Sequence, residues 1–115
     1  MSYTVKLCYD GEPAIVAPHR EGSMPCISNP TRAEMDITWN YGHFYRELID
    51  AEQGIRWLYG QKAEDTIFAL WGAIAVLGTY RDEDYYAPTP GNAGYALSIL
   101  LFWAEQHPDA VWEGD

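Results

Sequence analysis

The sequence has few basic residues. Of its 115 residues, seven are Lys or Arg and seventeen are Asp or Glu, so the formal net charge is −10 at pH 7. Proteins that hold the phosphate backbone of nucleic acids need clustered Lys and Arg, and so do proteins that adsorb to anionic membranes. The charge therefore argues against direct nucleic-acid binding and against a membrane surface. It favours either a solvated acidic surface or an acidic face that meets a basic macromolecule.

Long apolar runs and cysteines are also scarce. No run is long enough to cross a membrane, and residues 1–10 lack the basic start and apolar core of a secretory leader. The two cysteines, Cys8 and Cys26, come without a secretory signal, so a disulfide between them is not favoured. We therefore expect a reduced, cytoplasmic protein, folded as a single domain over residues 1–115.

Motifs for catalysis are missing as well. Gly91–Gly94 precedes no Lys-Ser/Thr pair of a phosphate loop, and no G-x-S-x-G stretch occurs. Ser23, Cys26 and His19 lie close in sequence, but no pattern around them indicates an activated nucleophile. We expect a protein that is not an enzyme and that needs no cofactor.

The first third of the chain has the patterning of strands. Tyr3–Tyr9 alternates with period two, Asp10-Gly11 is a tight-turn pair, and Pro13–Pro18 is a short apolar stretch that completes a hairpin. Glu34–Trp39 alternates again and predicts a third strand.

The remainder has the patterning of helices. Helical spacing places one set of apolar side chains on a single face of Ala63–Leu77: Ala63, Ile67, Leu70, Trp71, Ile74 and Leu77. The opposite face is apolar too, so we expect this helix to be central and covered on several sides. His43–Ala51 predicts a short helix, and Thr89-Pro90 begins a last helix that Pro108 stops. We expect the acidic tail Asp109–Asp115 to be partly loose, with Val111 and Trp112 able to dock. The predicted class is α+β, a small antiparallel sheet packed on about three C-terminal helices.

Four residues are weak candidates for metal ligands. Zinc sites usually take two ligands from one turn through C-x-x-C or H-x-x-x-H pairs, whereas the spacings here are long and irregular. The favoured interpretation is small buried cysteines and ordinary histidines, and a structural zinc is the alternative. The four residues are Cys8, His19, Cys26 and His43.

The loop Tyr80–Tyr86 is the strongest candidate for a binding surface. Aromatic rings beside carboxylates combine apolar anchors with hydrogen-bond acceptors, which suits a basic, Arg-rich partner. The alternative is a solvated loop whose tyrosines cover the ends of two helices. The predicted contact residues are Asp82, Glu83, Asp84, Tyr85 and Tyr86.

Four segments carry a resemblance: DITWNYG (Asp36–Gly42), GIRWLYG (Gly54–Gly60), TPGNAGYAL (Thr89–Leu97) and WAEQHPDAVWEGD (Trp103–Asp115). In this order they resemble a family of small, uncharacterised bacteriophage and prophage proteins. The resemblance implies a mobile-element origin and expression in a bacterial cell, and it transfers no site residues. As a class, small acidic phage proteins resemble inhibitors of host defence, including anti-CRISPR proteins.

Three hypotheses follow. The leading one is a phage-encoded binding protein that inhibits a nucleic-acid-targeting defence complex such as a Cas effector. The second is a phage accessory domain that binds zinc or a small molecule through the Cys8–His43 region. The third is a structural accessory protein that acts by self-association.

Overall fold

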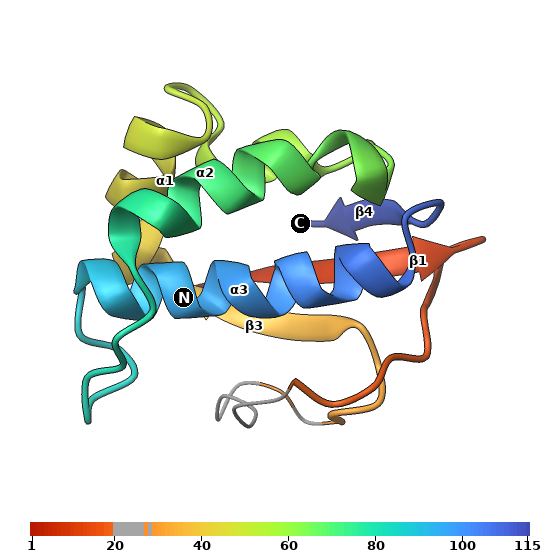
Figure 1. Cartoon of the computed structure of the whole chain (residues 1–115), viewed down its shortest axis with the longest axis horizontal. Helices are drawn as coiled ribbons and strands as arrows, with labels where there is room; N and C mark the ends of the chain where they lie inside the picture. The colour runs from red at the N-terminus through yellow and green to blue at the C-terminus, as the bar shows by residue number, and fades with distance from the viewer. Residues whose placement is uncertain (20–26, 28) are drawn as a thin grey trace.

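The computed structural model describes residues 1–19, 27 and 29–115, and it has an α+β fold with helices on one side of a four-stranded sheet (Figure 1). The strands are β1 (Ser2–Tyr9), β2 (Glu12–Pro13), β3 (Glu34–Thr38) and β4 (Val111–Gly114). The helices are α1 (Gly42–Leu48), α2 (Ile67–Leu77) and α3 (Pro90–Gln106), and the short 3-10 turns are η1 (Trp39–Tyr41), η2 (Gly54–Leu58) and η3 (Ala63–Asp65). The predicted class and the small antiparallel sheet are confirmed.

Strand β1 organises the sheet because it pairs antiparallel with all three other strands. In Figure 1 it lies between β3 and β4. The period-two pattern of β1 places Val5 and Leu7 in the core, where Val5 pairs with Met35 and Leu7 pairs with Trp112. Lys6 lies between Val5 and Leu7, so its side chain is on the opposite face of the sheet. There it is in register with Glu34 of β3 and Glu113 of β4.

Helix α3 packs over the sheet and is the most buried helix of the described chain. Twelve of its seventeen residues are buried. Thr89 caps it, because the Thr89 hydroxyl accepts the Asn92 N–H at 3.2 Å, and Pro90 occupies the first turn. The helix ends before His107, whose N–H donates to the Trp103 carbonyl. The predicted bounds of this last helix are therefore confirmed. The predicted helix His43–Ala51 is also present, as α1, but it begins one residue earlier and ends at Leu48.

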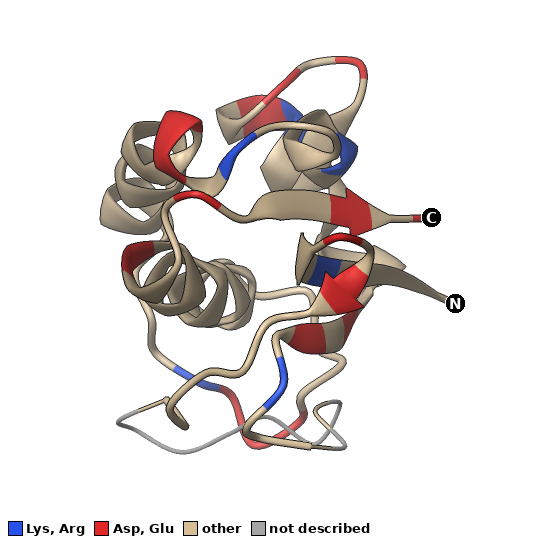
Figure 2. Ribbon diagram, turned by 90° about the vertical axis from the view of Figure 1, so that its right-hand side faces the viewer, with Lys and Arg blue, Asp and Glu red and all other residues tan. Residues whose placement is uncertain are grey.

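The expectation that Ala63–Leu77 forms the central helix is wrong. The segment begins as η3 and becomes α2 only after Thr66, and within α2 only Leu70, Ala73 and Leu77 are buried. Trp71, predicted to face the core, is 66% exposed. Helix α2 lies beside α3 on the helical side of the sheet (Figure 2), and in the described chain no further helix or strand covers its outer face. Helix α2 is apolar on all sides, yet only one of its faces is covered and the other is open.

The predicted second strand, Pro13–Pro18, is also wrong in extent. The tight turn is present, with positive φ at Asp10 and Gly11, but β2 contains only Glu12 and Pro13. Beyond β2 the chain keeps only scattered main-chain pairing, with an isolated bridge between Ile15 and Arg32. It then reaches the end of α3, where the Ala17 N–H donates to the Gln106 side-chain oxygen at 2.7 Å. Proline has no N–H to donate to a ladder, which is consistent with the early end of the strand.

The C-terminal tail is an ordered strand and not the partly loose segment we expected, although the expected docking of Trp112 is confirmed. Val111–Gly114 forms β4, and Trp112 has no exposed surface. The indole N–H of Trp112 donates to the buried Thr66 hydroxyl at 2.8 Å. The Asp115 carboxylate accepts the Thr4 N–H at 2.9 Å. Burial of one large aromatic side chain anchors the whole tail to β1.

Candidate functional site

The loop between α2 and α3 contains all five predicted contact residues, and one buried asparagine holds it in place. Asn92 is 1% exposed. Its side-chain oxygen accepts the Asp82 N–H at 2.9 Å, and its amide nitrogen donates to the carbonyls of Asp84 and Ala87, each at 3.0 Å. A buried amide with this many partners fixes the path of a loop that has no regular secondary structure.

Two glycines of α3 let the loop run close to the helix. A Cβ on Gly91 would lie 1.9 Å from the Tyr80 carbonyl oxygen, and one on Gly94 would lie 1.8 Å from the Gly78 carbonyl oxygen. No side chain fits at these distances. The returning chain therefore packs directly on the first two turns of α3.

The carboxylates of the loop are exposed, yet two of them also serve its internal structure. Asp82, Glu83 and Asp84 are exposed residues. The Asp82 carboxylate accepts the Asp84 N–H at 2.9 Å, and the Asp84 carboxylate accepts the Tyr86 N–H at 3.0 Å. These turns leave each carboxylate with further lone pairs toward solvent. The acidic groups are thus presented in fixed positions.

The two tyrosines differ in role. Tyr85 is half-buried, its hydroxyl donates to the Asp36 carbonyl at 3.1 Å, and its own carbonyl accepts from the Tyr41 hydroxyl. Tyr86 is 61% exposed, and its carbonyl accepts the Asn40 side-chain N–H at 2.8 Å. Tyr85 therefore fastens the loop to β3, and the Tyr86 ring remains available for contact.

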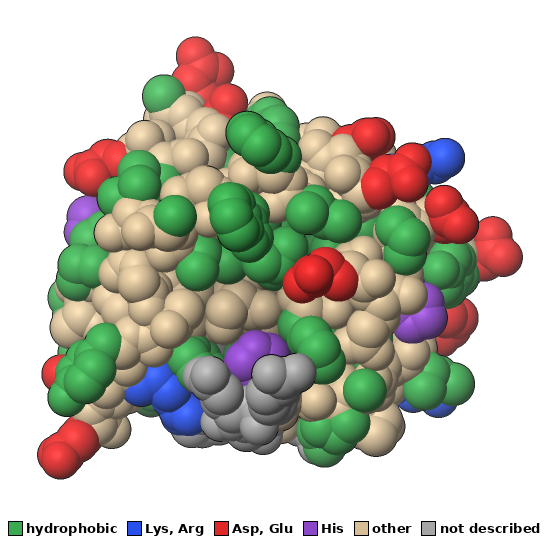
Figure 3. Space-filling view, in the orientation of Figure 1, with side chains coloured by type: hydrophobic (Ala, Val, Ile, Leu, Met, Phe, Trp, Pro, Cys, Tyr) green, Lys and Arg blue, Asp and Glu red, His purple; other side chains and the backbone are tan. Residues whose placement is uncertain are grey.

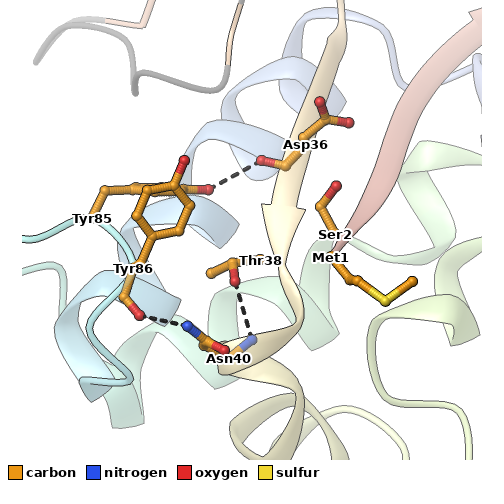
Figure 4. Close-up of a pocket in the computed structure, with 7 residues that line it drawn as sticks. All are labelled: Met1, Ser2, Asp36, Thr38, Asn40, Tyr85 and Tyr86. Atoms are coloured by element: carbon orange, nitrogen blue, oxygen red, sulfur yellow. Dashed lines mark hydrogen bonds between the residues drawn. The ribbon is translucent and has the colours of Figure 1, made fainter.

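A hollow of about 420 Å³ lies between this loop and the end of the sheet (Figure 4). Seven residues line it: Met1, Ser2, Asp36, Thr38, Asn40, Tyr85 and Tyr86. The Asp36 carboxylate accepts the Thr4 hydroxyl at 2.9 Å, so it is already oriented. The lining combines a carboxylate, amide and hydroxyl groups and aromatic rings, which is a set suited to a hydrogen-bond donor or a cation.

The hollow brings together two segments that are far apart in sequence. Asp36, Thr38 and Asn40 line it from one segment, and the loop on its other side is held by Asn92 in the first turn of α3. The prediction singled out Tyr85 and Tyr86 but missed Asp36, Asn40 and Asn92. A polar Asn in an otherwise apolar helix start is a signal that could have identified Asn92, whereas nothing local marks Asp36 and Asn40.

Negative charge is spread over the molecule and is not confined to the loop. Figure 2 shows Asp and Glu on strands, helices and connections alike. Between two described residues one ion pair is found, Lys6 Nζ to Glu34 Oε1 at 3.6 Å. The Arg81 guanidinium lies 4.7 Å from the centre of the Tyr95 ring, and Arg56 donates to the main-chain oxygen of Asp115. What distinguishes the loop is therefore its rigidity and its aromatic neighbours.

The candidate metal ligands lie on different elements. Cys8 is buried in β1, His43 is exposed on α1, and the His19 ring meets Tyr95 and Phe102 edge-on with centroids 5.6 and 5.4 Å away. Burial first, and Glu113 second, raise the pKa of Cys8 to about 11, which disfavours the thiolate that zinc requires. Among the described residues no group of three or more His, Cys, Asp or Glu side chains is placed to hold a metal ion. Cys26 lies outside the described residues, so the zinc site stays a prediction.

None of the helices in the described ranges combines the length and the apolar character that a membrane crossing requires. Comparisons of the chain with protein-family models, with curated proteins and with solved structures gave no match.

Proposed function

We propose that this protein is a phage-encoded binding protein that inhibits a bacterial nucleic-acid-targeting defence complex, such as a Cas effector. It would occupy a basic surface that otherwise holds nucleic acid. The contact surface is Asp82–Tyr86 together with the adjoining hollow.

One observation carries the proposal: an exposed acidic loop is held rigid by internal hydrogen bonds. Asn92 fixes its main chain, and Asp82 and Asp84 cap its own turns. A loop that is already ordered loses little conformational entropy on binding. Ordered carboxylates at the tip of such a loop suit the Lys and Arg side chains of a nucleic-acid channel.

The hollow adds a place for one cationic side chain of the partner. The Asp36 carboxylate lies on one of its walls, and the exposed ring of Tyr86 lies on another. A guanidinium can pair with a carboxylate and stack on an aromatic ring at the same time. The loop carboxylates would then supply the surrounding negative field, which speeds encounter with a positive surface.

The test uses several purified Cas effector–guide complexes, with binding measured by pull-down and inhibition measured by target cleavage. The informative variant is Asp82→Asn, Glu83→Gln, Asp84→Asn, because the amides keep the oxygens that accept the loop N–H groups and remove only the charge. We expect binding to weaken by about tenfold or more for this triple variant.

A second triple variant, Glu47→Gln, Glu52→Gln, Asp109→Asn, is the matched control. It removes the same three charges from exposed positions elsewhere in the chain. We expect it to bind close to normally. An equal loss of binding in both variants would show that binding depends on the net charge and not on the loop. Undiminished target cleavage with all effectors would refute the proposed function.

A further inference from the structure

The outer face of α2 carries an apolar stripe that none of the described residues covers. Phe68, Trp71 and Val76 are 87, 66 and 70% exposed. Gly72 and Ala75 lie between them and are exposed too. These positions follow helical spacing, so they form one continuous row along α2. Large aromatic side chains exposed side by side are uncommon on a protein that buries its core well.

The stripe borders a groove between α2 and α3. Six residues line this groove of about 350 Å³: Glu64, Ile67, Phe68, Trp71, Leu101 and Glu105. Figure 3 shows hydrophobic side chains gathered over these two helices, with carboxylates at the margin. The groove is therefore an apolar floor with two acidic residues at its rim, Glu64 from η3, just before α2, and Glu105 from α3.

The dimensions and the charge indicate what the groove accepts. Helix α2 has eleven residues, which corresponds to a length of about 16 Å, or three helical turns. A helix of similar length can place its apolar side chains between Phe68, Trp71 and Leu101. The two rim carboxylates select for Lys or Arg beside those apolar side chains.

A second copy of this chain fits the groove less well. In a symmetric contact, groove against groove, it would bring the same glutamates to the interface. In any contact between copies, each carries a net charge of −10. Like charges placed face to face oppose association. The chemistry of the rim therefore favours a basic partner over self-association.

From these observations we propose that the groove between α2 and α3 binds a short amphipathic helix of another protein, one whose apolar face is flanked by Lys or Arg. This surface involves none of the residues of the acidic loop or its hollow, so it stands independently of the proposed function. Phe68 and Trp71 would be the anchors, and Glu64 and Glu105 would pair with the flanking cations.

The test uses two fluorescently labelled model peptides of equal length, both with Leu at helical spacing. One carries Lys beside the leucines and the other carries Glu, and binding is measured by fluorescence anisotropy. We expect the Lys peptide to bind, and we expect Trp71→Ala to weaken that binding by about tenfold or more. Ile15→Ala, which also truncates an exposed apolar side chain but lies elsewhere, should leave it unchanged.

The charge requirement is tested separately. Glu64→Gln with Glu105→Gln should weaken binding of the Lys peptide several-fold, whereas Glu47→Gln with Glu52→Gln should have little effect. The proposal is overturned if the Lys peptide does not bind, if the Glu peptide binds equally well, or if Trp71→Ala binds normally. It is also overturned if light scattering shows a dimer that Trp71→Ala dissociates, because the occupant is then a second copy. All of these outcomes are independent of whether a Cas effector is inhibited.

Discussion

Helices α2 and α3 are both strongly apolar, yet α3 is largely buried whereas one face of α2 is exposed. Helix α3 packs against the sheet on one side and against α2 and the returning loop on others, and most of its residues are buried. Helix α2 has α3 on one side, and its other face is open to solvent. Apolar composition alone does not decide which helix is central. The number of neighbouring layers decides it, and surplus apolar surface on the outer helix is then available for binding.

The glycines give the sharpest test of this difference. Gly94→Ala places a Cβ against the main chain of Gly78, and we expect it to lower the free energy of unfolding by about 3 kcal/mol or more. Gly72→Ala in α2 meets nothing within 4 Å, and helix propensity should stabilise it by about 0.5–1 kcal/mol. Urea unfolding of both variants measures the two effects. Similar changes in both would contradict the assignment of α3 as the closed helix.

Leucine and valine truncations extend the comparison to side chains. Leu100 of α3 has no exposed surface, and Leu100→Ala should cost about 2–5 kcal/mol. Val76 of α2 is 70% exposed, and Val76→Ala should change stability by less than about 0.5 kcal/mol. Thermal unfolding followed by circular dichroism would detect the difference, and a large loss with Val76→Ala would show that α2 is covered in solution.

Within the candidate site, truncation of the buried Asn92 should destabilise the protein more than truncation of the exposed Asn40. Asn92→Ala removes the buried amide that holds the loop, and we expect a loss of about 1–3 kcal/mol together with faster proteolysis between Tyr80 and Ala87. Asn40 is exposed and donates one side-chain hydrogen bond to the loop, so Asn40→Ala should cost about 0.5 kcal/mol. Equal proteolysis rates in both variants would show that Asn92 does not order the loop.

The smallest expected effect concerns pH and the buried thiol of the sheet. Burial raises the pKa of Cys8 from 9.0 to about 11, so the folded state keeps the proton while the unfolded chain loses it. The stabilisation is complete below pH 9 and is lost as the pH rises through 11. Between pH 9 and pH 11, the free energy of unfolding of the wild type should fall by about 1–2 kcal/mol more than that of Cys8→Ala. A constant difference across this range would contradict the raised pKa.

Much of the fold could be predicted because its signals are local. The alternation of Tyr3–Tyr9 and Glu34–Trp39, the turn at Asp10-Gly11 and the Thr89-Pro90 cap all depend on neighbouring residues. The tail could not be predicted as a strand, because Val111–Gly114 is ordered by pairing with β1, more than a hundred residues away. The docking of Trp112 was foreseeable from its size and apolar character, but the strand pairing of its neighbours was not.

The candidate site was predictable only in part, for the same reason. The acidic and aromatic composition of Asp82–Tyr86 is visible in the sequence. The residues that complete the hollow, Asp36 and Asn40, come from β3 and η1, and only the folded chain places them beside Tyr85 and Tyr86. The error over α2 arises because periodicity identifies an apolar face but does not say whether another element covers it.

Hydrogen–deuterium exchange of the protein alone and in complex with an inhibited Cas effector tests the central claim most directly. We expect slower exchange on binding in the loop Tyr80–Tyr86 and at the neighbouring segment Asp36–Tyr41. Binding and inhibition with unchanged exchange in both segments would show that the acidic loop is not the surface through which the protein acts.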